Sequence, residues 1–141
     1  FLRDSRSRGE KIDILCIQET HLLGDDKLSI PGYTWFGRNR TRICETATKG
    51  SGGVGILIRD ELREGSKHSI DDASTFGECE GYISLNVKKN KNDITVICAY
   101  HEWDRENFKV NHEAFLKGLM KKFKESKNRL LLTLIKKRKI I

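Results

Sequence analysis

The stretch that decides the fold is residues 12–22, which read Ile-Asp-Ile-Leu-Cys-Ile-Gln-Glu-Thr-His-Leu. Residues 12–17 are apolar except for Asp13, and so short an apolar run is typical of a strand buried in a sheet. The polar residues after it therefore stand where the strand leaves the sheet. A carboxylate at that point, Glu19, would be held rigidly at the edge of a cleft.

Other strands and one helix follow this first strand. Apolar and β-branched residues predict strands over 33–37, 54–58, 82–87, 94–99 and 130–135, of which 82–87 and 94–99 form a hairpin. Between the last two strands the period changes to that of an amphipathic helix, over 107–125. Its predicted core stripe is Phe108, Phe115, Leu116, Leu119, Met120 and Phe123. The glycines of 50–55 lack the Lys-Ser/Thr ending of a P-loop and indicate a tight turn before a strand.

The length and net charge of the chain indicate how many domains it has and which partners it could bind. The 141 residues form one domain, 1–141, with a net charge of +7. Residues 88–141 carry 15 basic and 6 acidic side chains, a net charge of +9. This excess indicates an anionic partner, with nucleic acid the usual candidate, or equally a solvated lysine face on the helix.

The sequence also bears on the compartment of the protein. No apolar run approaches the roughly 20 residues that span a bilayer, so no membrane partner is expected. No secretory signal is visible, and the four cysteines match neither a zinc site nor a redox motif. We therefore expect reduced thiols and an intracellular protein, with the nucleus open as its address.

Three groups of residues are candidates for metal or phosphate binding, and each also has an interpretation without a functional role. Glu19 suits Mg²⁺, which binds one or two carboxylates plus water and substrate phosphate, but its spacing alone favours an ordinary surface carboxylate. Tyr100, at the end of 94–99, either hydrogen-bonds a phosphate oxygen or caps the core with its ring. Arg38, Asn39 and Arg40 lie near aromatic residues, which suits a nucleic-acid backbone or an ordinary loop.

The order of these pieces is more specific than any one of them. Residues 12–22 resemble the signature of the endonuclease/exonuclease/phosphatase family, and most closely that of the endonuclease domain of retrotransposon endonuclease–reverse transcriptases. Further pieces resemble the family in its own order, so that the resemblance covers roughly 12–132. These pieces are 30–38, 52–58, 96–100 and 128–132.

The resemblance implies a fold and an activity. The family fold is a four-layered α/β sandwich of two packed mixed sheets flanked by helices. Its members are hydrolases that cleave phosphodiester bonds with Mg²⁺ or Mn²⁺, and the retrotransposon members nick DNA to prime reverse transcription. By the same resemblance, Glu19 is the metal ligand and Tyr100 the contact to the scissile phosphate. Gln18, the strand-end neighbour of Glu19, is expected to bind phosphate or nucleic acid, together with Arg38, Asn39 and Arg40. Glu19 and Tyr100 are then expected to face each other across a nucleic-acid groove.

The chain also departs from the family pattern. Nothing before residue 12 resembles the family's first strand with its active-site Asn, and residues 133–141 form a divergent basic tail where Gly-Asp-Phe-Asn is expected. The Ser-Asp-His motif has no counterpart. We therefore expect a partial sandwich without its first and last strands, with little or no nuclease activity alone. The alternatives are a non-catalytic nucleic-acid-binding remnant and a pseudogene fragment without function.

Overall fold

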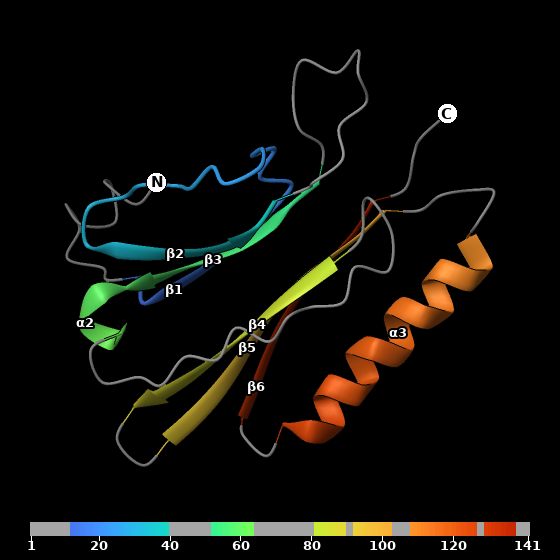
Figure 1. Cartoon of the computed structure of the whole chain (residues 1–141). Helices are drawn as coiled ribbons and strands as arrows, with labels where there is room; N and C mark the ends of the chain where they lie inside the picture. Colours follow the sequence, from blue (N-terminus) through green and yellow to red (C-terminus); the bar gives the residue numbers. More distant parts are fainter. Residues whose placement is uncertain are drawn as a thin grey trace.

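The computed structural model describes residues 12–39, 52–63, 81–89, 92–102, 108–126 and 129–137. Two three-stranded sheets, drawn in Figure 1, account for most of these residues. In chain order the elements are β1 (Ile14–Gln18), β2 (Tyr33–Arg38), β3 (Val54–Arg59), α2 (Asp60–Arg63), β4 (Gly81–Lys89), β5 (Asn92–Glu102), α3 (Phe108–Glu125) and β6 (Arg129–Lys137). All six predicted strands and the predicted helix are confirmed.

The first sheet has the order β1-β3-β2 and is antiparallel throughout its described strands. The mixed character predicted for each sheet is not seen among the described strands of this one. β3 lies in the middle, and its residues Val54 and Ile56–Ile58 are buried. β1 was predicted to be a buried strand, but its residues are only half-buried. In the described part β1 pairs with β3 on one side alone, which explains its exposure.

The second sheet has the order β4-β5-β6 and is mixed, as predicted. β4 and β5 form the predicted antiparallel hairpin, whereas β5 and β6 are parallel. Parallel neighbours need a crossover, and α3 provides it. β6 was predicted to end at residue 135, but it continues to Lys137, because its backbone stays in register with β5 as far as Glu102.

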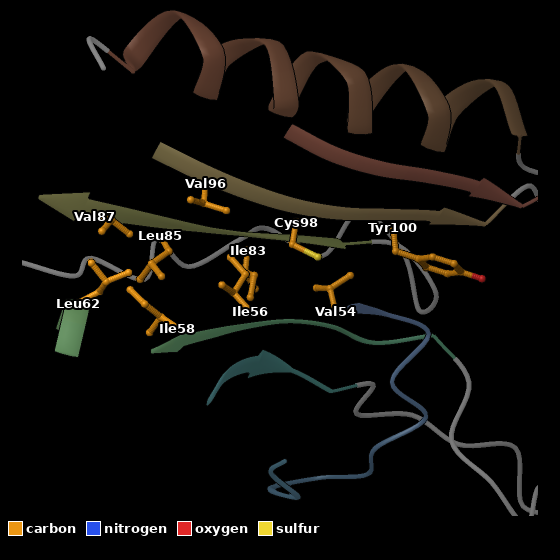
Figure 2. Close-up of a cluster of buried hydrophobic side chains, with 10 residues drawn as sticks. All are labelled: Val54, Ile56, Ile58, Leu62, Ile83, Leu85, Val87, Val96, Cys98 and Tyr100. Atoms are coloured by element: carbon orange, nitrogen blue, oxygen red, sulfur yellow. The ribbon is translucent and has the colours of Figure 1, made fainter. Parts of the chain in front are cut away.

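The hydrophobic core fills the space between the two sheets (Figure 2). Alternate residues of β3, β4 and β5 point into it, as the two-residue period of a strand requires. Val54 and Tyr100 lie at one end of this core, and Leu62 and Val87 lie at the other. The buried members are Val54, Ile56, Ile58, Leu62, Ile83, Leu85, Val87, Val96, Cys98 and Tyr100.

Helix α3 covers the face of the second sheet that points away from the first (Figure 1). Phe115, Leu119 and Phe123 pack there against the sheet, beside Ile97 and Ala99. The predicted core stripe was too wide. Leu116 and Met120 are 39% and 53% exposed, because at about 100° per residue they project to one side of the Phe115–Leu119–Phe123 line. Among the helices of the described residues, none is both long and apolar enough to cross a membrane.

Trp35 packs over two glycines on the outer face of the first sheet. Its ring occupies the space into which a Cβ atom on Gly37 or Gly55 would project. Gly37 and Gly55 are register partners on neighbouring strands, so the indole packs on a surface where two adjacent residues have no side chains. Leu57, the register partner of Trp35, is fully buried on the same face.

We predict that Gly55→Ala lowers the free energy of unfolding by about 1–3 kcal/mol, since the new methyl group must displace the Trp35 ring from a packed position. Urea unfolding monitored by tryptophan fluorescence measures this loss. Gly81→Ala is the matched control, because its Cβ would meet nothing closer than the Arg38 Cδ at 3.9 Å. Equal unfolding midpoints for the two variants would contradict the prediction.

Candidate functional site

Three side chains lie in one row across the first sheet, at the end where β1 and β2 finish. Val54 begins β3 and pairs with Gln18 on one side and with Arg38 on the other. Directly paired residues of an antiparallel sheet share a face. Val54 points into the core, so Gln18 and Arg38 are on the face that looks toward the second sheet.

Arg38 reaches the second sheet at the position that carries Tyr100. A Cβ atom on Gly81 would lie 3.9 Å from the Arg38 Cδ, and Gly81 is the register partner of Tyr100. At this distance a methyl group on Gly81 would make an ordinary van der Waals contact, so the arginine stem lies directly beside the start of β4. The ends of β1, β2, β4 and the Tyr100 position of β5 therefore come together at this edge of the molecule.

The backbone turns sharply where β1 ends. Glu19 and His21 have φ angles of 53° and 54°, in the left-handed region that residues other than glycine rarely adopt. Such conformations cost of order 1–3 kcal/mol each and cluster at functional sites. Two hydrogen bonds hold the turn, from the Thr20 N–H to the Gly53 carbonyl at 3.4 Å and from the His21 N–H to the Gly52 carbonyl at 3.1 Å.

This turn directs the Glu19 side chain to Tyr100. The Tyr100 hydroxyl donates a hydrogen bond to Oε1 of Glu19, with a distance of 2.9 Å between the two oxygens. The tyrosine is 2% exposed, and Figure 2 shows its hydroxyl pointing outward from the end of the core. The two side chains point toward each other, but they bond directly and do not face each other across a nucleic-acid groove, as was expected. Their catalytic roles stay predictions.

Cys98 lies two residues before Tyr100, on the same face of β5. Its thiol donates a hydrogen bond to the carbonyl of Ile17 at 3.5 Å, so β5 contacts β1 just below the Glu19 turn. A hydrogen bond with the Cys16 thiol, followed by burial, raises the pKa of Cys98 far above its ordinary value. Both sulfurs are thiols, as predicted, and that of Cys98 stays protonated at neutral pH.

The predicted nucleic-acid-binding residues separate in the structure. Gln18 and Arg38 lie beside the Glu19–Tyr100 pair. Asn39 uses its side-chain amide within the chain, because Nδ2 donates to the carbonyls of Gly24 at 2.9 Å and Asp26 at 2.7 Å. Arg40 and the rest of 40–51 lie outside the described residues.

The donor set limits which metal this edge would bind. Within the described ranges no three His, Cys, Asp or Glu side chains gather as a metal cluster. Glu19, the carboxylate at this edge that contacts Tyr100, is half-buried. That fits a Mg²⁺ or Mn²⁺ ion that keeps most of its ligands as water and substrate phosphate, and it does not fit a closed protein cage.

Sequence reasoning did not identify Thr20 and Gly53 as part of this site. It read the glycines as a tight turn before β3, without linking them to the end of β1. The two successive glycines, 52 and 53, were the available signal, and both have positive φ angles of 70° and 88°. Only the pairing of β1 with β3 shows that they support the Glu19 turn.

Comparisons with known proteins identify the fold. No protein-family model matches the chain, and no curated protein does either. The solved structure of the endonuclease domain of TRAS1, a telomere-specific non-LTR retrotransposon, matches with a TM-score of 0.55 and 15% identity, over 94% of this chain and 49% of that domain. A humanized D. rerio TDP2 carrying 14 mutations matches with a TM-score of 0.55 and 14% identity, over 95% of this chain and 51% of TDP2.

These likenesses confirm the α/β fold that the sequence resemblance predicted. This chain spans about half the length of the two solved structures. At such low identity the likeness concerns the fold alone.

We predict a coupling energy of about 1–2 kcal/mol between Glu19 and Tyr100, because a hydrogen bond to a charged group is stronger than one between neutral groups. The measurement is a double-mutant cycle of Glu19→Gln and Tyr100→Phe in urea unfolding. Tyr33→Phe is the control, since the Tyr33 hydroxyl donates to the Ile12 carbonyl and not to Glu19. A coupling of zero, or one as large for Tyr33, would show that the contact does not form in solution.

We also predict that Cys98 makes the fold sensitive to alkali. Its raised pKa means that the folded state keeps the thiol proton where the unfolded state loses it. Stability is then complete below the ordinary thiol pKa of about 8.5 and falls above it, by up to about 1.4 kcal/mol per pH unit. Urea unfolding at several pH values should show a shallower decline for Cys98→Ala than for the wild type. Parallel declines would refute the assignment.

Proposed function

We propose that this chain carries part of the active site of a divalent-metal-dependent phosphodiesterase that cuts nucleic acid, a DNA endonuclease of the retrotransposon type in the endonuclease/exonuclease/phosphatase family. The observation that carries the proposal is the 2.9 Å hydrogen bond between Tyr100 and Glu19, formed where both sheets end. The shared fold and the sequence resemblance of residues 12–22 support it.

Glu19 would hold the metal ion. Its carboxylate stands at the end of a strand, and the backbone strain at φ 53° is typical of a residue whose direction matters. When bound, Mg²⁺ or Mn²⁺ would neutralise charge that develops on the phosphate oxygens. The hydrogen bond from Tyr100 to Oε1 fixes the orientation of this carboxylate at the end of β1.

Tyr100 would orient the carboxylate and contact the phosphate. Its buried ring fixes the position of the hydroxyl, since the core packs around it. A phenol both donates and accepts hydrogen bonds, so the hydroxyl can turn from Glu19 to a phosphate oxygen without moving the ring. A fixed donor of this kind contributes to phosphate binding without a cost of reorganisation.

Arg38 would supply positive charge for the nucleic-acid backbone. Its stem lies against Gly81, beside the Tyr100 position, so its guanidinium is within the same edge of the molecule. Guanidinium groups bind phosphate through paired hydrogen bonds. Gln18, in the same row, offers a neutral amide to the same ligand.

A second candidate function is binding of nucleic acid without cleavage. The net charge of +9 on residues 88–141 favours it. The lysines Lys117, Lys121 and Lys124 are exposed on α3, although Glu113 and Glu125 pair with the first two at 3.9 and 3.8 Å. This candidate predicts DNA binding that weakens steeply with salt and does not depend on a metal.

We predict that the chain binds Mn²⁺ and that Glu19→Ala weakens this binding at least about 10-fold, because it removes the carboxylate ligand. Titration of free Mn²⁺ by electron paramagnetic resonance measures the affinity. Glu113→Ala is the matched control, since Glu113 is an exposed carboxylate on α3.

The outcomes separate the two candidates. Equal Mn²⁺ affinity for the wild type and Glu19→Ala, with salt-dependent DNA binding, would favour the non-catalytic function. Metal-dependent nicking of supercoiled DNA that Glu19→Ala abolishes would support the nuclease and overturn the expectation that the chain is inactive alone.

A further inference from the structure

Gly53 occupies a central place among the strand ends that build the site. It directly precedes Val54, which pairs with both Gln18 and Arg38. A Cβ atom on Gly53 would project into the Thr20 hydroxyl on one side and approach the Arg38 carbonyl to 3.5 Å on the other. Because Gly53 has no side chain, the Thr20 side chain can occupy the space beside its Cα atom.

Thr20 contributes volume at this contact and not a hydrogen bond. Its Oγ1 is buried and has no hydrogen-bond partner among the residues that the structure describes. A buried hydroxyl without a partner is unfavourable, so its presence calls for a steric reason. The side chain fills the space over Gly53, and its neighbours on either side, Glu19 and His21, take the left-handed backbone.

The backbone hydrogen bonds by themselves do not set the direction of Glu19. The bonds from Thr20 and His21 to the Gly53 and Gly52 carbonyls hold the turn against β3, but both donors belong to residues that follow Glu19. The close packing of Thr20 on Gly53 further restricts the turn. Because Glu19 directly precedes Thr20, its carboxylate is then directed at Tyr100.

We propose that Thr20 and Gly53 are positioning residues, whose complementary sizes aim the Glu19 carboxylate at Tyr100 and at the metal that it would hold. The metal part rests on the proposed function, whereas the aim at Tyr100 does not. A larger residue at position 53 or a smaller one at position 20 changes the direction of the Glu19 side chain while the carboxylate itself stays present. Changing both sizes together restores the fit.

The experiment reads the direction of Glu19 through Tyr100. The chain has three tyrosines, so ¹³Cζ-labelled tyrosine gives three resonances, and Glu19→Gln identifies the one from Tyr100. Gly53→Ala is expected to shift this resonance by at least half as much as Glu19→Gln does. It should also weaken Mn²⁺ binding about 10-fold, as changes behind a metal ligand do.

Gly24→Ala is the matched control. Gly24 also has a positive φ, of 48°, but a Cβ there would meet nothing within 4 Å. This variant therefore carries the backbone strain of an alanine without the crowding. It should lower the melting temperature yet leave the Tyr100 resonance and the Mn²⁺ affinity unchanged.

Two further variants keep the proposal testable if Gly53→Ala does not fold. Thr20→Ala should shift the Tyr100 resonance, while Thr20→Ser, which keeps the oxygen over Gly53, should not. The double variant Thr20→Ala/Gly53→Ala should bring the resonance back toward that of the wild type.

The outcomes for the positioning role and for the metal are distinct. A Tyr100 resonance that stays in place in Gly53→Ala and Thr20→Ala, or that moves equally in Gly24→Ala, overturns the positioning role. If the resonance moves as expected but the wild type binds no Mn²⁺, the positioning role stands and the proposed metal-dependent function fails.

Discussion

The hydrogen bond from the Tyr100 hydroxyl to the Glu19 carboxylate joins the two sheets at the end of the apolar core that lies between them. It forms because β5 crosses the core beside β1, so that Cys98 and Tyr100 reach the Ile17 carbonyl and the Glu19 side chain in turn. The row of core residues thus ends in a polar contact. At this end the apolar core meets the polar side chains of the candidate site.

The rest of the site depends on the alignment of strand ends. β3 is the reference, because β1 and β2 both pair with it and both finish beside Val54. Gly53, directly before it, leaves room for the turn of β1, and the Arg38 stem lies beside Gly81. A small residue beside a fixed strand therefore lets the Glu19 side chain approach Tyr100, at the cost of strained backbone at Glu19.

Much of the fold was predictable, because short apolar runs and a 3.6-residue period are local features. β1 and α3 were predicted correctly as elements, but the predicted burial of β1 and the predicted core stripe of α3 were wrong in part. The apolar run of β1 indicated full burial, but exposure depends on which strands pair beside it, and that is not local. Leu116 and Met120 fit a helical stripe by spacing, yet the width of the contact is set by the shape of the sheet beneath. The short helix α2 was not predicted, since four residues carry too little pattern.

By itself the sequence determined the succession of strands and helix, the two-residue alternation of the core strands, and the placement of Glu19 and Tyr100 just where apolar runs end. These follow from chemistry between near neighbours in the chain. Only the tertiary structure decided that Glu19 and Tyr100, 81 residues apart, share a hydrogen bond, and that Thr20 rests on Gly53. The tertiary structure also shows that the Asn39 side chain donates to the carbonyls of Gly24 and Asp26 and not to a group of the site. The reason is physical: strand register and sheet packing arise from contacts between distant segments, and no local pattern of residues encodes the distance between two side chains.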